Sequence, residues 1–217
     1  MIAGIDSVPS SPAELLGDPH PLLEQLGLPQ DLPVTSTMTG LVEFQNVSSL
    51  PALRTFLDAY RSQILVPVEL PAIVAAYHHA ARGEARELIA ADERLAQDAA
   101  IRKFASASCR VGQRQLSRLR PMRDQRLVHR YLAAIEDGKA RGWHTLVYGV
   151  SLAMFSLPLR QGLQHYIEQT LRGFIYSSAK SLCLTEATCD ALLMDQAAQI
   201  PHEIEAALNG SSVPLLC

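Results

Sequence analysis

Residues 142–179, "GWHTLVYGVSLAMFSLPLRQGLQHYIEQTLRGFIYSSA", decide the fold class of this chain. The part before Leu157 is apolar on every side of a helix, which is typical of a helix buried at the centre of a protein. A second helix follows Pro158, and its apolar residues recur at helical spacing on one side: Leu159, Leu163, Tyr166, Ile167, Leu171, Phe174 and Ile175. The other side carries Arg160, Gln161, Gln164, His165, Glu168 and Arg172. A buried helix followed by a long amphipathic helix predicts an all-α protein.

The same 3.6-residue periodicity extends outward over the rest of the chain. It predicts further helices over 49–65, 70–83, 84–98, 103–120, 123–138 and 186–208. Pro51 and Pro71 are each expected in a first turn, where a missing N–H costs nothing, and Pro201 interrupts the last helix. With no sustained strand alternation, we expect a single-domain bundle of about eight helices over 22–208. An irregular N-terminal arm, 1–21, should precede it, and a tail, 209–217, should follow it.

The composition restricts the function classes. The chain has 217 residues, a formal net charge of −3 and a mean hydropathy of +0.08. No window reaches the ~18 uninterrupted apolar residues of a membrane span, and the start lacks the pattern of a secretory signal. We therefore expect a cytoplasmic protein without a membrane segment. Four scattered cysteines form no C-x-x-C pair and are expected to be free thiols; a metal site at Cys183 and Cys189 would need further ligands.

Sequence patterns of catalysis are absent from the chain. It contains no phosphate loop, dinucleotide fingerprint, H-E-x-x-H or nucleophile elbow. His144 begins the apolar helix, where a hydrogen-bonded core or capping histidine is a simpler interpretation than a catalytic base. We therefore predict a binding protein with no enzymatic activity, cofactor or metal site. A helical enzyme built from His144, His165 and distant carboxylates remains a lower-ranked hypothesis.

The stretch 103–130, "KFASASCRVGQRQLSRLRPMRDQRLVHR", concentrates positive charge in this mildly acidic chain. Helical spacing places Ser108 and Gly112 on an inward stripe, where two small residues four apart allow close packing. The arginines face the opposite side: Arg110, Arg114 and Arg118 on the first helix, Arg126 and Arg130 on the next. They can serve as a solvated surface, a protein interface or a nucleic-acid surface. The negative net charge and the lack of a known binding module make nucleic acid the weakest of the three.

The order of segments resembles the urease accessory protein UreF family from about Leu22 to Leu208. The matching segments are "LLEQLGLPQDLPV", "SLPALRTFLDAY", "AAYHHAARGEARELIAADERL", "SCRVGQRQL" and "WHTLVYGVSLAMFSLPLRQGLQHYIEQTLRGFIYSSAKSL". The last is similar to the family's His-x-x-x-x-Gly helix, its Leu-Pro-Leu turn and its long amphipathic helix. Ser108, Gly112, His144 and Gly149 stand on the family's pattern positions.

The resemblance implies an all-α homodimer without enzymatic activity, cofactor or dedicated nickel site. Such a protein joins a UreG-type, nickel-delivering GTPase and a UreD/UreH-type accessory protein to apo-urease, and it helps couple GTP hydrolysis to nickel insertion. We expect the five outward arginines to contribute to a protein–protein surface or simply to solvation, and we expect no nucleic-acid or membrane partner. The alternative is a helical nucleic-acid-binding or regulatory protein that uses the same 110–130 surface.

Overall fold

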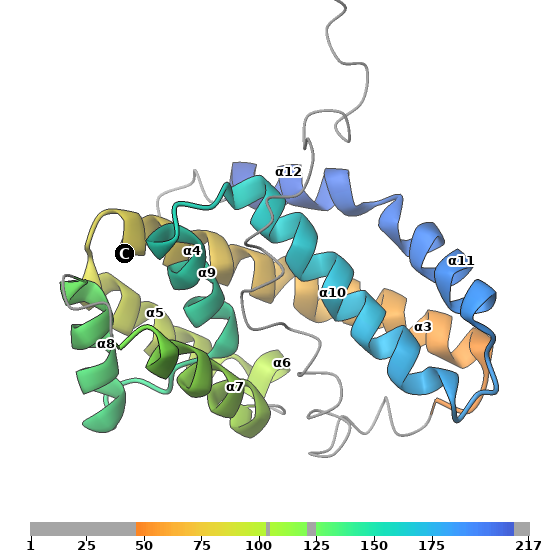
Figure 1. Cartoon of the computed structure of the whole chain (residues 1–217), viewed down its shortest axis with the longest axis horizontal. Helices are drawn as coiled ribbons and strands as arrows, with labels where there is room; N and C mark the ends of the chain where they lie inside the picture. Colours follow the sequence, from red (N-terminus) through yellow and green to blue (C-terminus); the bar gives the residue numbers. More distant parts are fainter. Residues whose placement is uncertain (1–46, 103–104, 121–124, 211–217) are drawn as a thin grey trace, which may run out of the picture.

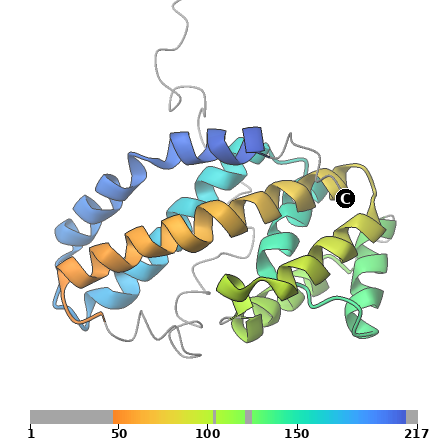
Figure 2. The same ribbon diagram turned by 180° about the vertical axis from the view of Figure 1, so that it is seen from behind.

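The chain folds into a bundle of helices in a computed structural model that describes residues 47–102, 105–120 and 125–210 (Figures 1 and 2). Within these ranges no strand is present, so the predicted all-α bundle of about eight helices is confirmed. The helices are α3 (Leu50–Tyr60), η3 (Arg61–Glu69), α4 (Leu70–Ala81), α5 (Ala85–Gln97), α6 (Ala99–Arg102), α7 (Ala105–Arg118), α8 (Arg126–Glu136), α9 (His144–Met154), α10 (Leu159–Ala179), α11 (Glu186–Ala197) and α12 (Ile200–Gly210). The arm predicted at 1–21, the segment 22–46 and the tail from Ser211 lie outside the described residues.

Helix α9 lies at the centre of the bundle, as its apolar sequence predicts. Every residue from His144 to Leu152 is buried, and α4 and α7 pack against this helix from different sides. A Cβ atom added at Gly149 would lie 2.9 Å from the Ala76 Cβ and would overlap the Ile73 carbonyl oxygen. The glycine is therefore required because the backbones of α4 and α9 are in direct contact where they cross.

The segment from Leu50 to Ala81 forms one continuous helix, and here the prediction of two separate helices is wrong. Ser49 caps its start, with Pro51 in the first turn as expected. Pro71, however, lies inside the long helix, because residues 61–69 form a π-helical stretch that joins α3 to α4. A proline ring collides with the carbonyl four residues earlier in an α-helix. The wider π turn accommodates the neighbouring Pro67 without ending the helix.

The long helix passes a simple length-and-hydropathy test for membrane crossing, the one described segment that does so. Its buried side carries Arg61 and Glu69, and both are hydrogen-bonded to other side chains inside the bundle. The partners of Arg61 come from α11 and α12, and burial of such groups among other helices indicates a core helix of the bundle.

Helix α10 packs on more than one side. Its apolar stripe is buried as predicted, but His165, assigned to the polar side, is also only 8% exposed. The prediction of a solvent-facing His165 is wrong, because α10 packs against α11 and α12 in addition to α3 and α4 (Figure 1). In Figure 1, α10 lies with α3, α11 and α12 in the right-hand part of the bundle, while α5, α7 and α8 form the left-hand part.

Candidate functional site

Helix α7 is fixed to the start of α9 by the two small residues that the sequence places on its inward side. The hydroxyl of Ser108 accepts a hydrogen bond of 3.1 Å from the backbone N–H of His144. A Cβ atom at Gly112 would overlap the carbonyl oxygen of Gly142 and lie 2.8 Å from the His144 nitrogen. The close-packed seam predicted at these positions is therefore confirmed, and it leaves the opposite side of α7 facing outward.

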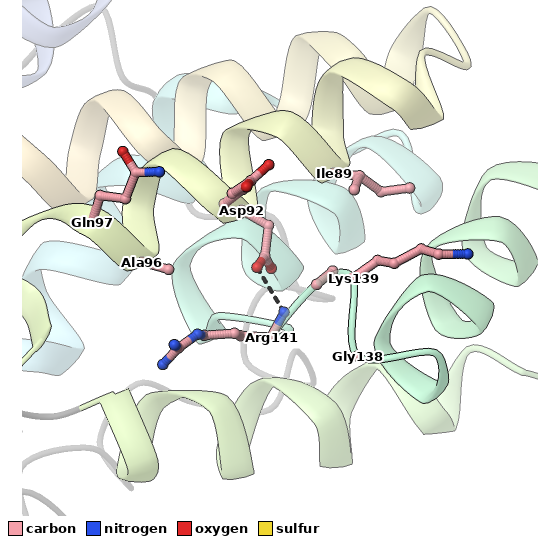
Figure 3. Close-up of a pocket in the computed structure, with 9 residues that line it drawn as sticks. Ile89, Asp92, Ala96, Gln97, Gly138, Lys139 and Arg141 are labelled. Atoms are coloured by element: carbon pink, nitrogen blue, oxygen red, sulfur yellow. Dashed lines mark hydrogen bonds between the residues drawn. The ribbon is translucent and has the colours of Figure 1, made fainter.

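The loop before α9 is held by Asp92 of α5, a carboxylate buried completely. It accepts hydrogen bonds from the Tyr131 hydroxyl at 2.5 Å and from the backbone N–H groups of Arg141 and Gly142 at 2.7 and 2.9 Å. Figure 3 shows the contact with Arg141. The Gln113 side chain of α7 donates to the Arg141 carbonyl at 2.8 Å, so α5, α7, α8 and α9 meet at this loop.

The outward side of α7 carries a row of like charges. Arg110, Arg114 and Arg118 are exposed, as predicted, and they are the only charged residues of this helix. They follow one another at i,i+4 spacing, which costs an isolated helix about 0.2–0.5 kcal/mol for each like-charge pair. None of the three forms an ion pair with a described residue. Among the described residues, no ion pair offsets this repulsion.

Helix α8 packs against α7 and adds two more exposed arginines, Arg126 and Arg130, again four residues apart. The only acid in α8, Glu136, already pairs with Arg120. Within the described ranges, Arg126 and Arg130 also have no acidic partner. We refer to Arg110, Arg114, Arg118, Arg126 and Arg130 together as the arginine face.

The family-pattern histidine is a core residue. His144 is fully buried and stacks on Tyr166 with ring centroids 5.7 Å apart. Burial lowers the pKa of His144 to about 3, so its ring is neutral at physiological pH. The expected side-chain hydrogen bond is not observed: neither ring nitrogen bonds to a described residue, because the capping contact is made by the backbone N–H.

Features that would support catalysis are weak in the described part of the chain. It contains no cluster of three or more His, Cys, Asp or Glu side chains able to hold a metal ion. Burial raises the pKa of the Cys109 thiol to about 12, which suppresses its reactivity. A shallow pocket of about 500 Å³ lies between α5 and residues 138–141 (Figure 3), but the Asp92 carboxylate beside it already has three donors.

Two buried polar clusters were missed by sequence reasoning. At the ends of the π-helical stretch, Tyr60 donates a hydrogen bond of 2.7 Å to the Glu69 carboxylate. Burial raises the pKa of Glu69 to about 7. The charge of Glu69 in turn helps raise the pKa of buried Tyr166 on α10. The only sequence signal for this cluster was Glu69 itself, an acidic residue just before the apolar segment 70–76. An acidic residue at that place is equally compatible with an exposed side chain.

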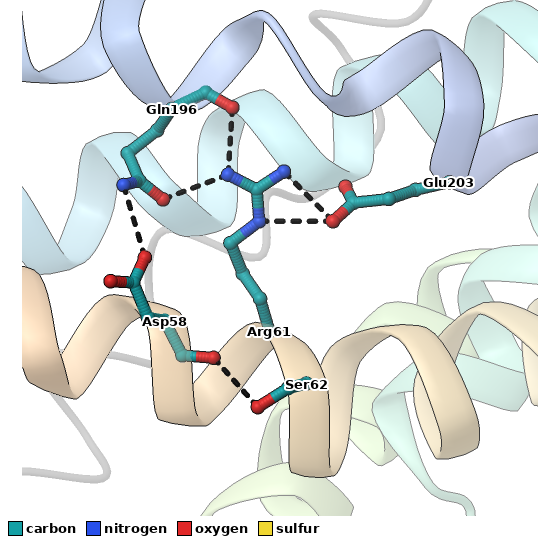
Figure 4. Close-up of polar contacts among 5 residues, drawn as sticks. All are labelled: Asp58, Arg61, Ser62, Gln196 and Glu203. Atoms are coloured by element: carbon teal, nitrogen blue, oxygen red, sulfur yellow. Dashed lines mark hydrogen bonds and ion pairs between the residues drawn. The ribbon is translucent and has the colours of Figure 1, made fainter.

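The second missed cluster surrounds Arg61 and ties the last two helices to the long helix (Figure 4). The Arg61 guanidinium donates to the backbone and side-chain oxygens of Gln196 at 2.7 and 2.8 Å, and to Glu203 at 3.0 Å. Burial raises the pKa of Glu203 even though the nearby Arg61 charge opposes this shift. These partners come from distant parts of the sequence and leave no local pattern.

In its described residues the chain is an all-α bundle with five exposed arginines that form no ion pair and without a metal-ligand cluster. A family model described as UreF matches residues 47–197, which is more than half of the chain. The chain therefore belongs to the UreF family of urease accessory proteins. A search of curated proteins gave no significant match.

The matched range includes all four pattern positions. Ser108 and Gly112 form the α7–α9 seam, His144 opens α9 and stacks in the core, and Gly149 permits the α4–α9 crossing. All four therefore position helices rather than bind a partner directly. The arginine face also lies inside the matched range, but its role in binding remains a prediction.

Proposed function

We propose that this protein is a non-enzymatic scaffold for assembly of the urease nickel centre. In this role it joins a UreG-type GTPase and a UreD/UreH-type accessory protein to apo-urease in the cytoplasm, acting as a homodimer. The observation that supports the proposal is the UreF family match over residues 47–197, the same region that folds as one bundle.

The surface chemistry is compatible with a scaffold. Helix α7 presents exposed guanidinium groups that form no ion pair with a described residue. Arginine is enriched at protein interfaces because it makes bidentate contacts. We assign the arginine face to partner binding on this basis. The core histidine is neutral and enclosed, so it offers no evident route for acid–base catalysis.

Deletion of the gene in a urease-positive host tests the proposal. We expect loss of urease activity and of urease-bound nickel, measured by elemental analysis of the purified enzyme, while the amount of urease polypeptide stays constant. Re-expression of the full chain should restore both, and an empty vector is the matched control. Unchanged nickel content and activity in the deletion strain would contradict the urease role.

A further inference from the structure

We propose that the α7 row Arg110–Arg114–Arg118 binds a carboxylate-bearing face of a partner protein. This inference deepens the proposed function and rests on it for the identity of the partners. At a rise of 1.5 Å per residue the row extends over about 12 Å, and its members recur about every 6 Å along the helix. Each guanidinium can form a bidentate pair with one Asp or Glu of the opposing surface.

Charge complementarity supports an acidic partner. Three exposed arginines, Arg54, Arg82 and Arg120, are each paired with an acid of the chain. Others, such as Arg86 and Arg94 of α5, also lack an ion pair with a described acid, but their helix carries acids of its own, whereas α7 carries none. The three arginines of the row have no acidic partner among the described residues and repel one another along one side of the helix. A row of carboxylates on another protein would relieve this repulsion and supply the missing counter-charges.

The row is also held rigidly. Ser108 and Gly112 fix the inner side of α7 against α9, and Gln113 bonds to the loop before α9. Partner binding would therefore order only the arginine side chains, since the helix that carries them is already in place. Preorganisation of this kind lowers the entropic cost of association.

The side chains between the arginines favour a protein over a nucleic acid. The other exposed positions of α7 are Ser106, Gln113 and Ser117, which are small or polar. Single-stranded nucleic acids are typically held by aromatic side chains that stack on bases, and the described residues of α7 expose none. The net charge of −3 further weakens attraction to a phosphate backbone.

A charge-reversal experiment tests the inference on the full-length protein. The probes are the UreG-type GTPase and the UreD/UreH-type protein encoded in the same genome, each purified and titrated separately. We expect Arg114→Glu with Arg118→Glu to weaken binding of one probe at least about tenfold. The matched control is Arg86→Glu with Lys180→Glu, which gives the same change in net charge at two exposed cations, one on α5 and one at the C-cap of α10. It should leave both affinities unchanged.

A conservative pair of variants makes the test independent of folding effects. Arg114→Lys with Arg118→Lys keeps the charges and introduces amines that a carbodiimide couples to adjacent carboxylates. We expect mass spectrometry to find amide cross-links from these two positions to Asp or Glu residues of one probe. This should be the probe whose binding is weakened by charge reversal. Lys180, which is exposed elsewhere, is the internal control and should remain unlinked.

Three outcomes would overturn the inference. They are undiminished binding of both probes after charge reversal, cross-links confined to Lys180, or binding of a random-sequence DNA duplex that charge reversal abolishes. Because these readouts measure binding, they are separate from the urease role. If the charge-reversed protein still binds both probes and still supports nickel insertion, the arginine row is not part of the interface. The proposed scaffold function would then still stand.

Discussion

Gly112 of α7 lies directly against the backbone of His144, with no room for a side chain between the two helices. An added Cβ would come within 2.8 Å of the His144 nitrogen and 2.9 Å of the Trp143 carbonyl carbon. Backbone atoms cannot rotate away, so the contact sets the distance between α7 and α9. The same contact determines where Arg110, Arg114 and Arg118 of α7 stand relative to the core.

Replacement of Gly112 by alanine should therefore destabilise the protein, despite alanine's higher helix propensity. Propensity favours the variant by about 1 kcal/mol, whereas overpacking typically costs about 1–3 kcal/mol, with rigid backbone neighbours at the upper end. We expect a net loss of about 1–2 kcal/mol in the free energy of unfolding, measured by urea denaturation. Ser106→Ala, exposed on the same helix, should change stability by less than about 0.5 kcal/mol. A Gly112→Ala protein more stable than the wild type would contradict the close contact.

The second prediction concerns the Asp92 carboxylate, which holds the loop before α9. Asp92→Asn keeps the shape of the side chain but replaces one acceptor oxygen by an NH₂ group, which faces the groups that now donate to Asp92. Each buried donor left without an acceptor lowers the stability by about 1–3 kcal/mol. We expect a loss of about 2–4 kcal/mol in unfolding free energy. Trp143, the only tryptophan of the chain and next to this loop, provides the fluorescence signal.

Tyr131→Phe supplies the matched comparison, because it removes only one of the three donors to Asp92. The loss should be smaller, about 1 kcal/mol. The double variant should lose less unfolding free energy than the sum of the two single losses, since the two residues share one hydrogen bond. Strictly additive losses would show that Asp92 and Tyr131 do not act together.

How much of this structure could be predicted depends on how local each signal is. The burial of α9, the amphipathic stripe of α10 and the two sides of α7 follow from helical periodicity over a few turns, and all three are confirmed. Pro71 does lie in the first turn of α4, but the expected break before it is absent because the π-helical stretch, which contains Pro67, joins α3 to α4. Arg61 and Glu203 stand 142 residues apart, and nothing in either local sequence indicates that the two charges meet in the core.

Glu69 leads to a prediction on pH dependence. Burial raises its folded-state pKa to about 7 from the ordinary value of 4.5, so the unfolded chain releases this proton first as pH rises. Stability should therefore fall between about pH 4.5 and pH 7 and remain lowered above that range. By linkage the loss is on the order of 3 kcal/mol.

Glu69→Gln removes this titration while keeping an oxygen acceptor for the Tyr60 hydroxyl. The variant should match the wild type near pH 4.5 and exceed its unfolding free energy at pH 8, as measured by urea denaturation. Tyr60 and Tyr166 stay protonated across this pH range because their pKa values lie well above 10, and the titration of groups common to both proteins cancels in the difference. Glu93→Gln, at an exposed site, is the control. An advantage for Glu69→Gln that grows toward low pH would contradict the assignment.

The last prediction concerns Arg61, which anchors α11 and α12 to the long helix. Arg61→Met should cost about 3–5 kcal/mol in unfolding free energy, because it leaves the Glu203 carboxylate buried without its counter-charge. Adding Glu203→Leu removes that stranded charge and should recover part of the loss, since apolar groups can replace a buried ion pair at little cost. Amide hydrogen exchange of residues 200–210 should follow the same order, fastest in Arg61→Met and slower in the double variant. Equal stability of the single and double variants would show that the unpaired carboxylate is not the source of the loss.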